Sequence, residues 1–372
     1  MTRLTVPWGI FGYGNIGDEA MLQGFATLLR GHPRKLRVSV ASQNPQHDSA
    51  VEPSLRYFHA AGGNPLRRRF ASLFSRAWLV VGDTPVTDVL GSWPLEGLNA
   101  IVRSAQRHGK PIAFVGGGSE PLRQQRSLQI VSEMLAPTVT HWSVRAESDK
   151  ERLVGYGVDP GRITVAADLA WLVRPVESSV GENPLTPRRP RIAVNLTNEA
   201  FVSRLNPRIF VVLARFLDVL AAEYGARIVF VSNEVRSDEQ FDQAAARLVI
   251  AMMRCGNETC KAPNRYFPPQ EMLSLIAGCD FVITMRYHCC LFAALQSIPF
   301  LALKRSSKLG DICNDLAWPF AVDIADLDEG RLVDLFIHLH REKSRLAEHL
   351  SQKVAILRER SWRNRAAIEA VL

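Results

Sequence analysis

Short, mostly apolar runs rich in β-branched residues alternate with longer amphipathic segments along the first half of the chain. The runs with the length and composition of buried strands are residues 5–11, 36–41, 77–81, 111–115, 141–144 and 163–166. Helical spacing of apolar residues is found between them, at 19–30, 96–108, 127–135 and 148–156. Strands separated by helices form βαβ crossovers, so the pattern predicts a mostly parallel α/β sheet.

The same pattern begins again in the second half of the chain. Residues 174–190 hold four prolines and few apolar side chains, which is typical of a linker. Further strands are expected at 191–196, 226–232, 281–284 and 299–303, and helices at 207–223, 239–253, 269–278, 287–296 and 332–372. We therefore predict two Rossmann-like, doubly wound domains that face a cleft. They cover residues 1–175 and 191–340, are joined by a linker at 176–190, and are followed by a C-terminal helix at 341–372.

Composition narrows the class of protein. The 372 residues are enough for two domains, and 47% of them are hydrophobic, which excludes general disorder. The net charge of +8 favours anionic ligands. The six cysteines lack the spacing of a zinc site, so no metal is expected. With no signal peptide and no clean apolar run of membrane-spanning length, the chain is expected to be cytoplasmic.

A glycine-rich turn, GYGNIGDE at 12–19, connects the first strand to the first helix. It fits the dinucleotide pattern GxGxxG, but the second strand ends without the acidic residue that would hold a ribose. A second interpretation is a tight turn in which Asp18 caps the helix and Glu19 complements its dipole. A third is a loop that presents Asp18 or Glu19 to a ligand with hydroxyl groups.

Three other polar or glycine-rich positions follow predicted strands directly. They are the glycines at 116–118, Arg145 and Asp168. Ligands of such sheets bind beyond the carboxyl ends of the strands, which makes all three candidates for a binding site. The alternatives are a plain turn for the glycines, a surface ion pair with Glu147 or Glu151 for Arg145, and a helix cap for Asp168.

Arg286 and His288 interrupt an apolar strand-to-helix junction in the second half of the chain. Burial of an unpartnered charge is costly, so an anion is expected beside this pair. The start of a helix adds the positive end of a dipole, which suits a phosphate. The alternative is a core arginine paired with Asp280 or Asp168, next to a packed histidine.

Four stretches in this order resemble the polysaccharide pyruvyl transferase family. They are GYGNIGDEAML (12–22), SVRAES (143–148), VAADLAW (165–171) and TMRYHCCLFAALQSIPFLAL (284–303), and the resemblance extends from residue 8 to residue 320. It implies a two-domain protein similar to the GT-B glycosyltransferases. It also implies transfer of pyruvate from phosphoenolpyruvate to a sugar of a polysaccharide or lipid-linked glycan precursor, usually as a cyclic ketal, in exopolysaccharide biosynthesis.

The resemblance assigns donor binding to Arg145, Arg286 and His288, with phosphoenolpyruvate as co-substrate and no other cofactor. Two guanidinium groups can hold its carboxylate and phosphate, and His288 can supply a proton. We expect Asp18 to deprotonate the attacking hydroxyl, with Glu19 and Asp168 as alternatives. The interpretation requires that the three donor-binding side chains face one another and are not neutralised by the protein's own carboxylates.

The remaining loop residues are assigned to the acceptor side. These are Gly14, Asn15, Gly17, Asp18, Glu19, Gly117, Gly118 and Asp168. Two departures from the family pattern also fall on this side. Family members usually carry a GGG motif followed by an Asp at the strand near residue 80, but residues 80–88 of this chain read VVGDTPVTD. The family usually has a glycine before the proline at 121, but this chain has Glu120. They leave the acceptor and the ketal outcome open.

Two rival functions and several partners stay open. A nucleotide-sugar-dependent GT-B glycosyltransferase would share the architecture and would use Glu234 for a ribose; a non-catalytic glycan- or protein-binding relative would release no phosphate. Nucleic acid is not expected, because the basic clusters at 67–69 and 188–191 lack interleaved aromatics. Arg358, Arg360, Arg363 and Arg365 near Trp362 could contact an anionic membrane surface, at the inner face of the membrane. The alternative is that this last helix packs across both domains. A homo-oligomer is also compatible with the sequence.

Overall fold

The computed structural model describes residues 2–60, 73–89, 91–176, 189–265 and 268–372. The chain divides into two compact units. Unit 1 comprises residues 1–13, 18–173 and 356–372, and unit 2 comprises 14–17 and 174–355. The glycine turn and the C-terminal helix therefore each contribute to both units, which the predicted division into consecutive domains did not include. Most of the predicted linker lies outside the described residues, as do 67–69 and Arg188.

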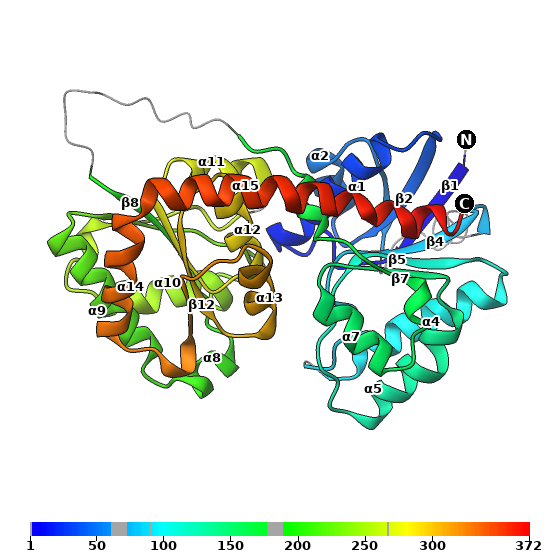
Figure 1. Cartoon of the computed structure of the whole chain (residues 1–372), viewed down its shortest axis with the longest axis horizontal. Coiled ribbons are helices and arrows are strands. Elements are labelled where there is room, and N and C mark those ends of the chain that lie inside the picture. The colour runs from blue at the N-terminus through cyan, green and yellow to red at the C-terminus, as the bar shows by residue number, and fades with distance from the viewer. Residues whose placement is uncertain (1, 61–72, 90, 177–188, 266–267) are drawn as a thin grey trace. The chain divides into compact units, whose positions relative to one another are not determined.

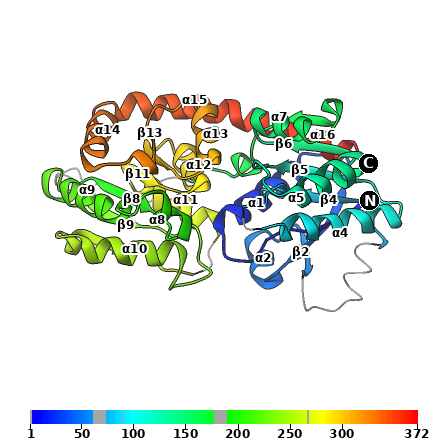
Figure 2. The ribbon, with the colours of Figure 1, turned by 90° about the horizontal axis from the view of Figure 1, so that it is seen from below.

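Unit 1 contains a seven-stranded parallel sheet with the strand order β3-β2-β1-β4-β5-β6-β7. Its strands are β1 (Thr2–Trp8), β2 (Leu36–Ser42), β3 (Arg56–His59), β4 (Ala77–Val81), β5 (Ile112–Gly117), β6 (His141–Val144) and β7 (Ile163–Val165). Its main helices are α1 (Ile16–Arg30), α2 (Pro45–Val51), α4 (Trp93–Arg107), α5 (Gln125–Gln129), α7 (Glu147–Gly155) and α16 (Arg365–Glu369), which lie on both faces of the sheet (Figures 1 and 2). Strands β4 and β5 are buried along their whole length, as their apolar sequences predict.

Unit 2 repeats this plan with six parallel strands in the order β10-β9-β8-β11-β12-β13. They are β8 (Arg191–Asn195), β9 (Arg227–Phe230), β10 (Thr259–Lys261), β11 (Phe281–Thr284), β12 (Phe300–Lys304) and β13 (Ala321–Asp323). Helix α9 (Ile209–Glu223) packs against α10 (Phe241–Met252) and α14 (Glu329–Arg341), while α12 (Tyr287–Leu295) packs against α11 (Pro269–Ala277) and α13 (Ser307–Asp315). Helix α15 (Lys343–Ser361) continues from unit 2 into unit 1.

Both sheets reverse their strand order at one point, between β1 and β4 in unit 1 and between β8 and β11 in unit 2. Such a reversal defines a doubly wound sheet, and ligands bind where the loops diverge from it. The predicted α/β fold with two Rossmann-like halves is confirmed. Among the helices that the structure describes, none combines the length and the hydropathy required to cross a bilayer.

Candidate active site

The reversal point of unit 2 brings together the loops that follow β8 and β11. Strand β8 is hydrogen-bonded to β11 in parallel register, so both strands end at the same edge of the sheet. Thr197 and Glu199 follow β8, whereas Arg286 and His288 follow β11 and begin α12. The predicted pair therefore lies at the position in a doubly wound sheet where ligands bind.

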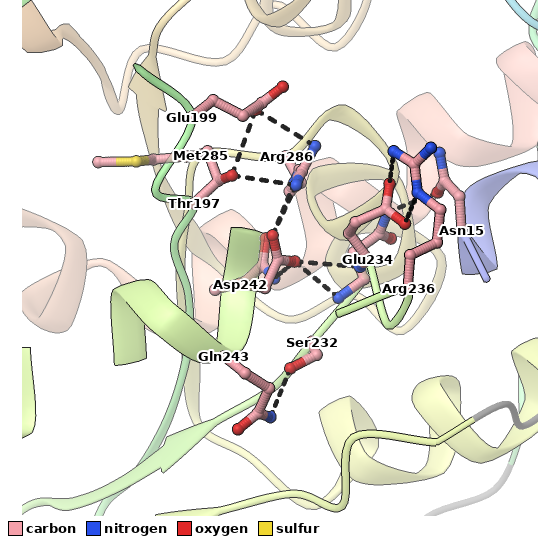
Figure 3. Close-up of polar contacts among 12 residues, drawn as sticks. Asn15, Thr197, Glu199, Ser232, Glu234, Arg236, Asp242, Gln243, Met285 and Arg286 are labelled. Atoms are coloured by element: carbon pink, nitrogen blue, oxygen red, sulfur yellow. Dashed lines mark hydrogen bonds and ion pairs between the residues drawn. The ribbon is translucent and has the colours of Figure 1, made fainter. Parts of the chain in front are cut away.

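Arg286 is almost fully buried and makes contacts with three side chains (Figure 3). Its Nε and Nη2 donate to Asp242 Oδ1 at 3.1 and 2.6 Å, and Nη2 also donates to Thr197 Oγ1 at 3.0 Å. Its Nη1 lies 3.5 Å from Glu199 Oε2. The guanidinium plane is thus fixed on one edge by Asp242, while Nη1 points to Glu199.

Asp242 organises this edge of the sheet, and sequence reasoning missed it. Its side chain is fully buried, and its Oδ2 accepts hydrogen bonds from Asn195 Nδ2 and from the backbone N–H groups of Asn233 and Glu234, at 2.9–3.1 Å. One carboxylate therefore orients Arg286 and also holds the loop after β9. The preceding residue, Phe241, has a positive φ of 58°, a strained conformation that such sites often contain.

The glycine turn is hydrogen-bonded to the same loop. Asn15 Oδ1 accepts from Asn233 Nδ2 at 2.8 Å, and the N–H of Val235 donates to the carbonyl of Gly14 at 2.7 Å. A Cβ added to Gly17 would lie 2.0 Å from Nδ1 of His288, so the imidazole packs directly against the Gly17 backbone. The structure therefore brings Gly14, Asn15 and Gly17 together with His288 in unit 2.

Glu199 lies between two arginines. Its Oε2 is 2.8 Å from Arg305 Nη1, at the end of β12, and accepts a hydrogen bond from Thr197 Oγ1 at 3.2 Å. Burial alone would raise the pKa of the Glu199 carboxyl, but Arg305, Arg286, Thr197 and Lys308 together hold this pKa below its ordinary value. Glu199 is therefore held by cationic side chains, which shows that an anionic group is favoured at this position.

One expectation about this site is wrong: the requirement that the donor-binding arginines are not neutralised by the protein's own carboxylates is not met, because Asp242 and Glu199 contact Arg286 and Asp168 contacts Arg145. Asp242 pairs with Arg286, and neither Asp280 nor Asp168 does so. Asp280 instead contacts Lys343 and the N–H of Arg191. The physical reason is that a buried arginine without a counter-ion is strongly destabilising, whether or not a ligand is bound.

Arg145 is the matching feature of unit 1, and it is paired as well. Its Nη1 lies 3.3 Å from Asp168 Oδ2, and its Nη2 donates to Thr84 Oγ1 at 2.8 Å. The guanidinium lies against Gly118, where an added Cβ would be 2.4 Å from Nη2. Asp168 also caps a short 3-10 helix by accepting from the N–H of Ala170 at 2.8 Å, so its capping role and its role as a charge partner are both present. The surface ion pair expected as an alternative for Arg145 is not formed, because this side chain is buried.

The two departures from the family pattern contact each other in unit 1. Thr87 Oγ1 donates to Glu120 Oε2 at 2.6 Å, and the N–H of Glu120 donates to the carbonyl of Val86. The carbonyl of Gly117 accepts from the N–H of Arg145 at 3.3 Å in the same region. Both departures therefore alter one surface, beside the carboxyl ends of β4 and β5.

The two carboxylates of the glycine turn belong to the first turn of α1 in unit 1, and both are buried. Glu19 Oε1 accepts from the N–H of Gly12 at 3.1 Å, across the turn. Burial raises the pKa of Glu19 well above its ordinary value, and the nearby Asp48 raises this pKa further. Asp18, Glu19 and Asp168 are all buried, and Asp168 is paired with Arg145.

Sequence comparison decides the family. A model of the family described as polysaccharide pyruvyl transferase matches residues 15–307 of the chain. The chain belongs to the polysaccharide pyruvyl transferase family. The match contains Asn15, Arg145, Asp168, Arg286 and His288, so this pyruvyl transferase family member carries its candidate site residues within the shared region. A search of the curated proteins found no match to the sequence.

Solved structures confirm the GT-B-like fold of this family member. Anabaena Alr3699/HepE in complex with UDP-glucose has a TM-score of 0.66 and 11% sequence identity, over 99% of this chain and 98% of that one. The S. aureus MnaA–UDP co-structure has a TM-score of 0.62 and 11% identity, over 94% and 91%. A UDP-N-acetylglucosamine 2-epimerase from Listeria monocytogenes, itself a putative assignment, has a TM-score of 0.61 and 12% identity, over 94% and 90%. At such identities the likeness extends to the fold alone.

The C-terminal arginines of this pyruvyl transferase family member have roles inside unit 1. Arg358 donates to the carbonyls of Trp171 and Val173, and Arg360 to those of Ala166 and Arg145, at 2.7–3.0 Å. Arg365 donates to the carbonyl of Gly31 and stacks on Trp362. Only Arg363 of the four predicted membrane-facing arginines is fully exposed. The hydrogen bonds of Arg358 and Arg360 thus hold the loop after β7, which carries Asp168, in place.

Proposed function

We propose that this protein transfers pyruvate from phosphoenolpyruvate to a sugar. The observation that carries the proposal is the position of Glu199, whose carboxylate lies between Arg286 and Arg305 at the reversal point of unit 2. Arg286, Arg305 and Lys308 face three carboxylates there, Glu199, Asp242 and Glu234, and Glu234 is also paired with Arg236. A carboxylate that occupies this position marks where an anionic donor group would bind.

Phosphoenolpyruvate suits such a site better than a singly charged ligand. Its carboxylate and phosphate are both anionic, and arginine can hold either group in bidentate fashion. The first turns of α12 and α13 begin beside Arg286 and Arg305, and the positive end of a helix dipole favours phosphate. We propose that the donor displaces the Glu199 carboxylate, while Asp242 stays in place and keeps Arg286 oriented.

The transfer then needs one acid and one base. A sugar hydroxyl adds to C2 of phosphoenolpyruvate while C3 gains a proton. A second hydroxyl of the same sugar then displaces phosphate from C2, its proton leaves with the phosphate, and the product is a cyclic ketal. His288 supplies the proton at C3, an effect worth about 10²–10⁴-fold in rate. Asp18, which follows Gly17 in the chain, removes the proton from the attacking hydroxyl.

The acceptor is proposed to be a sugar of a polysaccharide or lipid-linked glycan precursor. Arg145, which the family resemblance assigns to donor binding, belongs to unit 1, where Asp168 and Thr84 hold it against Gly118, beside the altered surface formed by Thr87 and Glu120. A neutral sugar needs hydroxyl and carboxylate partners more than charge, and this surface supplies both.

The test is incubation with phosphoenolpyruvate and a pool of glycan acceptors, followed by phosphate release and by the mass of the sugar. The expected result is release of inorganic phosphate with a matching pyruvyl gain on the acceptor. Arg286→Lys should lose most of this activity while it stays folded, because lysine cannot contact Asp242, Thr197 and the donor at once. Full activity in that variant would refute the donor site.

The main rival is a nucleotide-sugar glycosyltransferase, and one observation separates it from the proposal. Glu234, its candidate ribose ligand, is buried and engages Arg236 with both carboxylate oxygens, at 2.7 and 3.1 Å. A ribose would have to break this pair. If a nucleoside diphosphate raised the melting temperature of the protein and phosphoenolpyruvate did not, the glycosyltransferase would be favoured. If no acceptor gave phosphate release, a non-catalytic relative would be favoured.

A further inference from the structure

A second polar cluster lies in unit 1, where the first two helices meet, and it has no part in the proposed transfer. Glu19 comes from the first turn of α1, and His47 and Asp48 come from α2. Each offers a ligand atom, and the three atoms lie within 4.8 Å of one another. The side chain of Asp48 is 0% exposed and that of Glu19 is 1% exposed, whereas His47 is half-buried and closes the cluster on the solvent side.

The hydrogen bonding of the two carboxyl groups is incomplete. Glu19 Oε1 accepts from the N–H of Gly12. Among the residues that the structure describes, neither oxygen of Asp48 nor Oε2 of Glu19 accepts a hydrogen bond of normal geometry, although the two carboxyls interact with each other and the Ser42 hydroxyl interacts with Asp48. Buried polar atoms are almost always hydrogen-bonded, and two adjacent buried carboxylates are especially unfavourable. Such a pair keeps a proton or binds a cation.

The third member of the cluster, His47, indicates that the pair binds a cation. An imidazole beside two carboxylates is a ligand set of divalent transition metals. In a tetrahedral site with metal–ligand bonds of about 2.1 Å, ligand atoms lie about 3.4 Å apart. Side chains within 4.8 Å can reach that spacing by small rotations. We propose that Glu19, His47 and Asp48 bind one divalent transition-metal ion of the zinc class, with water as the fourth ligand.

The proposed metal is structural. It would join α1 to α2 and, through the hydrogen bond between Gly12 and Glu19, fix the start of the glycine turn. An added Cβ at Gly12 would lie 2.5 Å from the N atom of Asn44, so this turn and the start of α2 are already in close contact. The sequence predicted no metal because only cysteine and histidine spacing was considered, and here the ligands are mostly carboxylates. The inference is independent of the proposed transfer.

The test is titration of the full chain with Co²⁺, followed by visible absorption, with Zn²⁺ as competitor. We expect saturation at one equivalent, d–d bands without a near-ultraviolet thiolate band, and loss of the bands on addition of Zn²⁺. His47→Gln and Asp48→Asn should each weaken binding at least tenfold. His59→Gln, at an exposed histidine of β3, is the matched control and should bind as the wild type does.

Circular dichroism of each variant shows whether it is folded, and Asp48→Asn removes a buried charge, so it is expected to fold. Three outcomes would overturn the proposal. They are no saturable uptake of Co²⁺, unchanged binding in both His47→Gln and Asp48→Asn, or a thiolate band that places the ion at a cysteine instead. The first would mean that the two carboxyls only share a proton.

Discussion

Asp242 gives the most direct test of how the unit 2 site is built, through the substitution Asp242→Asn. The two oxygens of this buried carboxylate accept five hydrogen bonds, two of them from Arg286. Asparagine has nearly the same shape but presents one N–H₂ group. In one orientation of the amide, this N–H₂ group faces the N–H groups of Arg286. In the other it faces the backbone N–H groups of Asn233 and Glu234, so a donor meets a donor in both cases.

Removal of one partner of a buried ion pair costs about 3–5 kcal/mol. Thr197 and Glu199 still contact Arg286 in the variant, so we expect the lower end of this range, about 3 kcal/mol. Urea unfolding, followed by circular dichroism, should show this loss in the transition of unit 2. Asp334→Asn, at an exposed position of α14, is the matched control and should stay within about 0.5 kcal/mol of the wild type. A loss below about 1 kcal/mol, no more than a typical single hydrogen bond contributes, would refute the role given to Asp242.

Two further predictions concern neighbouring residues. Gly17→Ala should displace the His288 ring and reduce phosphate release by at least tenfold. Gly310→Ala is the control and should leave activity unchanged, because an added Cβ there meets nothing within 4 Å. Equal activity of the two variants would contradict the packing of His288 against Gly17. Glu199 has a pKa below its ordinary value of 4.5 in the folded protein, so its contribution to stability is present above pH 4.5 and is lost as the pH falls through the lowered pKa. The free energy of unfolding, measured as the pH is lowered, should show this loss in the wild type and not in Glu199→Gln. The same variant should bind inorganic phosphate more tightly, because the competing carboxylate is gone.

The sequence predicts the centre of each sheet well and its edges poorly. Strands β4, β6 and β11 have the predicted bounds and are buried at every position except His141, whereas the central strand β1, predicted at 5–11, spans Thr2–Trp8. The edge strand β7 was predicted at 163–166, but the other three edge strands, β3, β10 and β13, were not predicted. They are short and partly exposed, so they lack the apolar run that identifies a buried strand.

The sequence predicted the arginines of the candidate sites, but not the carboxylates Asp242 and Glu199 that pair with Arg286. Arg145 and Arg286 stand out because a charge in an apolar junction is rare. Asp242 does not, because an acidic residue in the first turn of a helix is common. Its pairing with Arg286 joins residues 44 positions apart, and only the order of the strands brings them together. Arg305 and Lys308 follow an apolar strand just as Arg286 does, and this signal could have identified them.

Calorimetric titration of the full chain with phosphoenolpyruvate, and separately with UDP-glucose, tests the central claim most directly. The account predicts saturable binding of phosphoenolpyruvate, at least tenfold weaker binding in Arg286→Lys, and no comparable binding of UDP-glucose. Binding of UDP-glucose together with no binding of phosphoenolpyruvate would contradict it. In that case the cations around Glu199 would serve a nucleotide sugar instead.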